Sequence, residues 1–324
     1  MRVFVAGATG AIGRQLVPRL RDAGHKVYGM TRSESKQAML VELGAVPVIA
    51  DALVADQVAD AVAHAQPDVI VHELTAIGAL DTRHFDRDFA LTNRLRTIGT
   101  DHLLAAGHAV GAKRFVAQSV AAFGMYGRSG ARVKSEDEDA LDTRPVPEMR
   151  ETLAAVKHLE QAVLSAEWTQ GIVLRYGAFY GPGTALAPGA EQFELIRRRK
   201  FPLVGDGGGI WSFIHVADAA EATIAAVERG TRGVYNIVDD DPAPVAEWLP
   251  ALAEKLDAKK PMHVPRFVGR LFAGRAGAVM MTEIRGAANA KAKRELGWEP
   301  AHPSWRIGFA EDTVASAEGE RLAA

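Results

Sequence analysis

Apolar residues follow two alternating patterns through the first half of the chain. Short runs of β-branched and aliphatic residues predict strands, and segments with apolar residues every three or four positions predict helices. The predicted strands cover residues 3–6, 25–30, 47–50, 68–71, 114–118 and 171–176. A first helix begins near Ile12, and further helices are predicted at residues 35–43, 54–64, 89–108 and 148–167. This alternation predicts an α/β fold built on a doubly wound parallel sheet.

Three glycines stand between the first predicted strand and the first helix. Glycine permits a tight turn and a close approach to a ligand, and the N-terminus of the following helix offers free N–H groups to an anion. The G-x-x-G-x-x-G spacing is a variant of the dinucleotide-binding fingerprint. Such a triplet also fits a structural turn, but its place between strand and helix favours a dinucleotide. We expect the cofactor to contact Gly7, Thr9, Gly10, Ile12 and Gly13.

The end of the second predicted strand indicates which nicotinamide cofactor binds. An NAD site places an acidic residue about 20 residues after the glycines, where it accepts from the ribose hydroxyls. Here the strand ends in Arg32 and Ser33, with no acid before Glu34. Because a guanidinium matches a phosphate in a bidentate geometry, we expect NADP, with NAD as the second choice. The alternative is that Arg32 is a solvated residue at a strand end.

Composition narrows the class of protein. The 324 residues are 48% hydrophobic and 24% charged, with a net charge of −2, which gives no reason to expect nucleic acid or an anionic membrane as a partner. There is no apolar run of the roughly 18 residues that a membrane span needs. The chain has no cysteine, which fits a reducing cytoplasm, and its ten histidines form no metal-binding motif. We therefore expect a soluble, cytoplasmic protein without a metal, acting on a small molecule.

Further motifs occur in a fixed order along the chain. They are Val71-His72, Leu74-Thr75-Ala76, Asn93, and residues 114–119, 175–183, 205–207, 213–218 and 235–238. With the glycines and Asp51, they resemble the extended short-chain dehydrogenase/reductase superfamily, usually labelled NAD-dependent epimerase/dehydratase. The resemblance spans nearly the whole chain. It implies a Rossmann domain at residues 1–177, to which residues 211–240 return, and a smaller substrate lobe at residues 178–210 and 241–324.

The resemblance also assigns further cofactor contacts. It implies that Asp51 and Ala52 meet the adenine, although Asp51 also suits a helix N-cap. The middle of the cofactor is then lined by Leu74, Thr75 and Ala76, and we add Tyr176 to the cofactor site.

The catalytic positions depart from the family pattern. Related enzymes use Tyr-x-x-x-Lys on the helix after the residue 124–147 loop, where the lysine holds the nicotinamide ribose and lowers the pKa of the proton-transferring tyrosine. Lys157 stands at the lysine position, but Leu153 replaces the tyrosine. The assisting hydroxyl position aligns with Val120, although Ser119 is adjacent. We expect Lys157 to contact the ribose, and we name Tyr126 and Ser119 as candidates for the proton relay.

The substrate positions depart as well. Sugar-nucleotide enzymes of this family have an asparagine where this chain has Ala178, and a diphosphate-binding arginine where it has Trp211. Without that amide and that cation, a diphosphate is poorly held. We therefore expect a smaller or more apolar substrate, contacted by Tyr126, Phe179 and Trp211. Trp211 also suits packing between the lobes.

Two classes of function fit these residues. We favour an epimerase/dehydratase-like oxidoreductase with an atypical proton relay over a catalytically silent, NADP-binding regulator, because the expected crevice keeps aromatic and hydroxyl groups. The resemblance also implies a homodimer that pairs the helices at 89–108 and 148–167, unless their apolar stripes cover the sheet. The stripes are Leu91, Leu95, Ile98 and His102, and Leu153, Val156, Leu159 and Val163.

Overall fold

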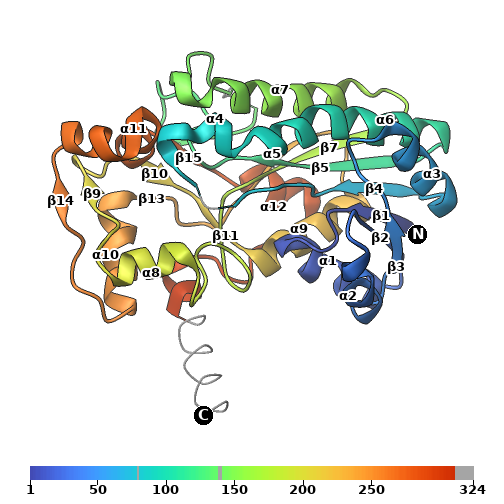
Figure 1. Ribbon diagram of the computed structural model, residues 1–324, viewed down its shortest axis with the longest axis horizontal. Helices are drawn as coiled ribbons and strands as arrows, with labels where there is room; N and C mark the ends of the chain where they lie inside the picture. Colours follow the sequence, from blue (N-terminus) through green and yellow to red (C-terminus); the bar gives the residue numbers. More distant parts are fainter. Residues whose placement is uncertain (79, 138–140, 311–324) are drawn as a thin grey trace, which may run out of the picture.

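A seven-stranded parallel sheet organises the computed structural model, which describes residues 1–78, 80–137 and 141–310 (Figure 1). Its strands are β1 (Arg2–Ala6), β2 (Lys26–Thr31), β3 (Val46–Ile49), β4 (Val69–His72), β5 (Arg114–Val120), β7 (Gln170–Tyr176) and β12 (Gly233–Ile237). They lie in the order β3-β2-β1-β4-β5-β7-β12. This confirms the predicted doubly wound α/β fold. The strand order changes direction between β1 and β4, which is where such sheets form their ligand crevice.

Successive residues of a strand point to opposite faces of the sheet, and in these strands the residues on both faces are apolar. Helices therefore cover both faces of the sheet. In β1, Val3 and Val5 enter the core beneath α1 (Ala11–Asp22) and α9 (Val216–Arg229), whereas Phe4 and Ala6 enter the opposite core. That opposite face carries α3 (Ala55–Ala65), α6 (Thr100–Ala109) and α7 (Arg150–Ser165) (Figure 1). The shorter helices α2 (Gln37–Glu42) and α12 (Ala290–Leu296) lie beside β3 and β12.

The helix predicted at residues 89–108 is divided in the structure. It consists of α5 (Ala90–Arg94), a π-helical turn at Leu95–Gly99, and α6, and it is preceded by the short helix α4 (Phe85–Asp88). The π turn adds a residue to the helical repeat and so rotates the following side chains away from a single predicted stripe. Arg96, within this turn, is buried, with its guanidinium 5.8 Å from the centre of the Phe89 ring.

The apolar stripe of α7 does not form an exposed interface. Its four residues are at most 3% exposed, and they pack into two cores: Leu153, Val156, Leu159 and Val163. In this chain Leu159 and Val163 pack in the core beside the sheet, and Leu153 and Val156 pack in the core of the smaller lobe, while the homodimer stays a prediction.

The remaining elements form the lobe beside the sheet (Figure 1). Its helices are α8 (Glu191–Arg197), α10 (Val245–Lys255) and α11 (Arg266–Thr282). Its parallel strand pairs are β8 (Ala178–Tyr180) with β11 (Phe213–His215), β9 (Leu203–Val204) with β14 (His263–Val264), and β6 (Val133–Lys134) with β15 (Gly286–Ala287). An antiparallel pair joins β10 (Ile210–Trp211) to β13 (Ala243–Pro244). Among the described residues, no helix has the length and apolarity to cross a membrane.

Candidate active site

Two cavities meet at the carboxyl ends of β1 and β4. One has a volume of about 540 Å³ and extends toward β2, and the other, of about 410 Å³, extends toward β7 and the smaller lobe. Five residues line both cavities: Gly7, Gly10, Glu73, Thr75 and Ala76. The cavities thus form one crevice that passes over the glycine loop.

The glycine loop has the geometry of a cradle for a diphosphate. A Cβ atom at Gly7, whose φ is +100°, would lie 2.6 Å from the Glu73 carbonyl oxygen, and one at Gly13 would lie 2.4 Å from the Gly7 carbonyl oxygen. Glycine is therefore required at both positions. Helix α1 begins directly after Gly10 without a side-chain cap, so its first N–H groups remain available to an anion that enters the crevice.

The 540 Å³ cavity brings together most of the cofactor residues expected from the sequence. Besides the shared residues it is lined by Thr9, Arg32, Ser33, Asp51, Ala52 and Leu74. Lys36 lines it as well, on the short 3-10 turn after β2, and the sequence analysis overlooked this second cation. Two cations at the end of β2 fit a phosphate better than a neutral ribose. The Asp51 side chain accepts from the Leu53 N–H at 2.9 Å and so also holds the turn.

The 410 Å³ cavity contains the expected substrate residues Phe179 and Trp211, together with Ser119 and Tyr176. The Trp211 indole N–H donates to the Met280 carbonyl at 3.0 Å, which fixes the ring at the lobe interface. Among the described lining residues there is no lysine, arginine or histidine, and Glu73 is the one carboxylic acid. A cavity without cations is poorly suited to the diphosphate of a sugar nucleotide.

Tyr126 does not line this crevice. Its side chain is fully buried, and its hydroxyl donates to Asn236 Oδ1 at 2.6 Å and accepts from Arg175 Nη1 at 3.0 Å. Burial raises the pKa of Tyr126 above its ordinary value, although Arg175 opposes this change. The structure therefore argues against our expectation that Tyr126 transfers a proton or contacts the substrate.

Ser119 lines the crevice, but its hydroxyl is directed elsewhere. It donates to Glu160 Oε1 at 2.6 Å, and Arg175 binds the same carboxylate through two nitrogens at 2.8 and 2.6 Å. Glu160 and Arg175 are both buried. The hydroxyl proton of Ser119 is thus held by a buried ion pair.

Lys157 also lies away from the crevice, contrary to our expectation that it would contact the ribose. Its ammonium donates to the Asp142 carbonyl at 2.7 Å and lines neither cavity. At the position of the missing tyrosine, Leu153 is 3% exposed. The neighbouring Thr152 hydroxyl donates to Asp86 Oδ1 at 2.7 Å and accepts from Asn93 at 3.1 Å. Neither residue supplies a free proton donor.

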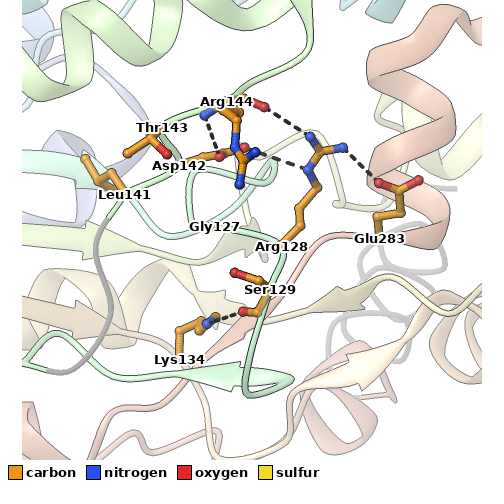
Figure 2. Close-up of a pocket in the computed structure, with 9 residues that line it drawn as sticks. All are labelled: Gly127, Arg128, Ser129, Lys134, Leu141, Asp142, Thr143, Arg144 and Glu283. Atoms are coloured by element: carbon orange, nitrogen blue, oxygen red, sulfur yellow. Dashed lines mark hydrogen bonds and ion pairs between the residues drawn. The ribbon is translucent and has the colours of Figure 1, made fainter.

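Asp142 belongs to a separate cavity of about 620 Å³ in the loop that follows β5 (Figure 2). Arg128 crosses this cavity, donating to Glu283 at 2.8 Å and to the Arg144 carbonyl at 3.0 Å. Lys134 donates to the Ser129 carbonyl at 2.7 Å. The charges of this polar cavity thus hold the loop in place, and the cavity shares no described lining residue with the crevice.

Glu73 is a site residue for which the sequence favoured a helix-capping or surface role over a catalytic one. It follows β4, is 6% exposed, and lies with its Oε1 atom 2.9 Å from the Tyr176 hydroxyl. Burial raises the pKa of Glu73 to about 8, although the contact with Tyr176 opposes the change. Burial thus favours the neutral, protonated form of its carboxyl group.

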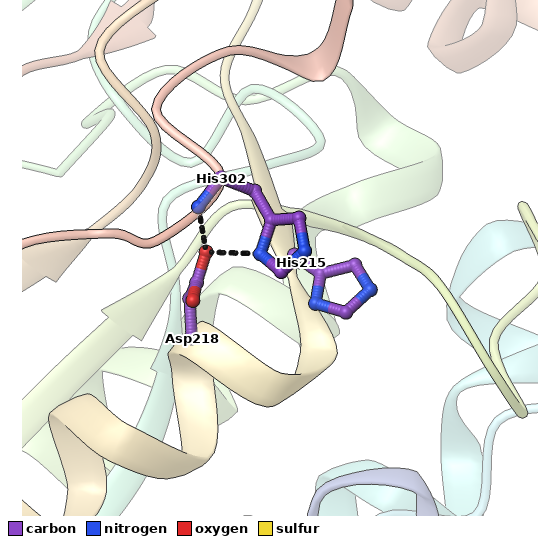
Figure 3. Close-up of side chains that lie close together, drawn as sticks. All are labelled: His215, Asp218 and His302. Carbon is purple, nitrogen blue, oxygen red and sulfur yellow. Dashed lines mark hydrogen bonds and ion pairs between the residues drawn. The ribbon is translucent and has the colours of Figure 1, made fainter. Parts of the chain in front are cut away.

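A cluster of His215, Asp218 and His302 joins α9 to the chain after α12 (Figure 3). The potential ligand atoms lie within 4.8 Å of one another. The Asp218 carboxylate accepts from the backbone of Ala301 and His302 at 3.1 and 2.9 Å and lies 3.0 Å from His302 Nδ1. His215 Nδ1 accepts from the Ala217 N–H and so caps α9. These contacts give the cluster a structural role, and the absence of a metal remains a prediction.

Comparison with known proteins agrees with this geometry. Residues 3–238 match the model of the NAD dependent epimerase/dehydratase family. The chain belongs to that family. A 3-diazoavenalumate denitrifying reductase from a Streptomyces species is 43% identical over 96% of this chain and 100% of its own length. A farnesyl-dihydroquinoline-oxide ketoreductase from Stigmatella aurantiaca is 29% identical over 78% of this chain and 73% of its own length.

The fold is also that of solved epimerases. A UDP-glucose 4-epimerase from Thermotoga maritima superposes with a TM-score of 0.77, covering 98% of this chain and 99% of that structure at 22% identity. The family and the named reductases identify this chain as an epimerase/dehydratase-type oxidoreductase that uses a nicotinamide dinucleotide.

Proposed function

We propose that this enzyme is an NADPH-dependent reductase of small, largely apolar acceptors and that it works without a side-chain proton relay. The observation that carries the proposal is the arrangement around α7. Leu153 replaces the tyrosine, Lys157 binds a loop carbonyl, and Tyr126 and Ser119 hold their protons in a buried network. Such a site suits a reaction that consumes a hydride but no proton.

The proposed cofactor site follows the crevice from β2 to β7. The adenine end lies at Asp51 and Ala52, with Arg32, Ser33 and Lys36 at the 2′-phosphate. The glycine loop and the N-terminus of α1 hold the diphosphate. The nicotinamide end lies in the 410 Å³ cavity, near Ser119 and Tyr176, and the substrate meets Phe179 and Trp211 there.

The substrate class that fits best is an aryl diazo compound. The relative at 43% identity is named for a diazo substrate, and the cavity offers aromatic walls without cations. When bound, NADPH supplies a hydride. An aryl diazonium ion that accepts the hydride forms a C–H bond at the ring carbon, and the electron pair of its C–N bond leaves with N2. The net reaction, ArN2⁺ + NADPH → ArH + N2 + NADP⁺, needs no proton donor.

A labelling experiment tests this proposal. The purified protein is incubated with NADPH deuterated at its transferable position and with an aryl diazonium carboxylate or a matched aryl ketone. We expect N2 release and one deuterium at the ring carbon that carried the diazo group. Reduction of the ketone alone would instead favour the activity named in the ketoreductase relative. Cofactor binding without either product would favour a regulator.

A further inference from the structure

Glu73 occupies the centre of the crevice, where the two cavities meet. Its backbone carbonyl lies so close to Gly7 that a side chain at that position would clash with it. Glu73 is also one of the residues that line both cavities. A dinucleotide that spans the crevice must therefore pass its diphosphate beside this carboxyl group. The Oε2 atom is buried and has no hydrogen-bond partner.

Two neutral hydroxyl groups, those of Tyr176 and Thr223, lie beneath Glu73. The Thr223 hydroxyl donates to the Ala219 carbonyl at 2.7 Å, because a carbonyl oxygen can only accept. The Tyr176 hydroxyl lies 2.7 Å from Thr223 Oγ1, where either oxygen can be the donor. The Tyr176 hydroxyl also donates to Glu73 Oε1 at 2.9 Å, so the buried carboxyl group receives this one hydrogen bond while its Oε2 atom receives none.

No described group that faces Glu73 offers a compensating charge. Tyr176 comes from β7 and Thr223 from α9, while the glycine loop presents only backbone. On the same element, His72 turns to Thr100, and burial lowers its pKa to about 4, so it is neutral. On the packed helices, Asp218 binds residues 301 and 302, and Glu221 pairs with Arg19. The guanidinium of Arg14 lies beside Gly183, which lines the 410 Å³ cavity.

We propose that Glu73 is a proton-linked part of the cofactor site: the dinucleotide binds beside this side chain while it is a neutral carboxylic acid, and the ionised form repels it. The inference rests on the nicotinamide site described under the proposed function. Burial favours the neutral form in the free enzyme, and an adjacent diphosphate favours it further because like charges repel. Binding in alkaline solution therefore takes up a proton.

Titration of the whole enzyme with NADPH across pH 6.5–9.5, followed by calorimetry in buffers of different ionisation enthalpy, tests the proposal. In the wild type, once the pH is high enough to ionise Glu73, the affinity for NADPH is expected to fall by up to about tenfold for each further pH unit. Under the same conditions, each cofactor that binds should take up close to one proton. Glu73→Gln keeps an uncharged group beside Tyr176, so its affinity should vary little over this range. Asp51→Asn, at the other end of the crevice, should change affinity by a constant factor and keep the wild-type slope.

The outcomes separate two failures. If the wild type binds NADPH at pH 7 but takes up no proton at pH 9, or if Glu73→Gln keeps the wild-type slope, the role of Glu73 is wrong while the cofactor site stands. If neither protein binds a nicotinamide dinucleotide at any pH, the cofactor site itself is wrong. Because proton uptake is measured on the wild type, the test holds even if the variant does not fold.

Discussion

The Ser119 hydroxyl lies 2.6 Å from Glu160 Oε1, so the residue lines the crevice while its proton points into a buried ion pair. Arg175 binds that carboxylate and also donates to the Tyr126 hydroxyl at 3.0 Å. Two of our sequence-derived proton donors are thus members of one internal network. The network links β5, α7 and β7 behind the crevice, and it stabilises the fold.

Replacing Tyr126 with phenylalanine is expected to reduce stability and to leave turnover intact. The change leaves Asn236 Oδ1 and Arg175 Nη1 without this buried partner, which costs about 1–3 kcal/mol. Urea unfolding measures this cost, and steady-state kinetics on the folded variant should change by no more than about twofold. Tyr235→Phe, which removes another buried tyrosine hydroxyl, is the matched control. If Tyr126→Phe loses turnover while Tyr235→Phe keeps it, Tyr126 acts as a proton donor after all.

Replacing Lys157 with methionine should leave cofactor affinity within about threefold, because the ammonium binds the Asp142 carbonyl. The loss of that hydrogen bond is expected to lower the free energy of unfolding by about 1 kcal/mol. Fluorescence titration with NADPH measures the affinity. A tenfold weakening in the folded variant would show that Lys157 reaches the ribose in the loaded enzyme.

Arg32→Asp should discriminate between the two nicotinamide cofactors. A carboxylate beside the 2′-phosphate replaces an attractive charge with a repulsive one, so NADPH affinity should fall by roughly 10–100-fold. NADH lacks that phosphate and should be affected much less. Arg21→Asp makes the same charge change on the exposed side of α1. It therefore serves as the control for the effect of the protein's overall charge on binding. Equal losses for both cofactors would remove Arg32 as the selector.

His72 is expected to make the fold sensitive to acid. Burial lowers its pKa to about 4, from an ordinary value of 6.5, so the unfolded chain binds its proton first. The neutral His72 side chain therefore contributes to the free energy of unfolding above pH 6.5. This contribution, about 3 kcal/mol, is lost as the pH falls toward 4.

The measurement is the free energy of unfolding at pH 7 and pH 5 for the wild type and for His72→Asn. The variant should lose less stability than the wild type over this interval. His64→Asn, on the exposed surface of α3, should retain the wild-type dependence. Parallel curves for all three proteins would contradict the assignment to His72.

The sequence predicted the sheet and the glycine loop because both depend on local patterns. Gly7, Gly10 and Gly13 lie within seven consecutive residues, and the alternation in β1 alone indicates two buried faces. The ends of parallel strands then bring Arg32 and Asp51 to one cavity without further information.

The proton donors could not be predicted in this way, because their directions depend on distant partners. Tyr126 is fixed by Asn236, 110 residues later, and Lys157 by a carbonyl of the preceding loop. For Glu73 the residue type was visible, but its burial depends on β7 and α9, which close over it. The π turn at Leu95–Gly99 likewise has no simple apolar period that would predict it.

The packing of Leu153 also determines how readily a tyrosine could be introduced at this position. A tyrosine restored at that position would enter a core in which leucine is 3% exposed, and overpacking of this kind destabilises proteins. It would also find its lysine partner bound to the loop. A tyrosine–lysine relay at these positions would therefore require coordinated changes in the core, the loop and the helix. A single Leu153→Tyr substitution is therefore expected to strain the core without creating a working proton relay.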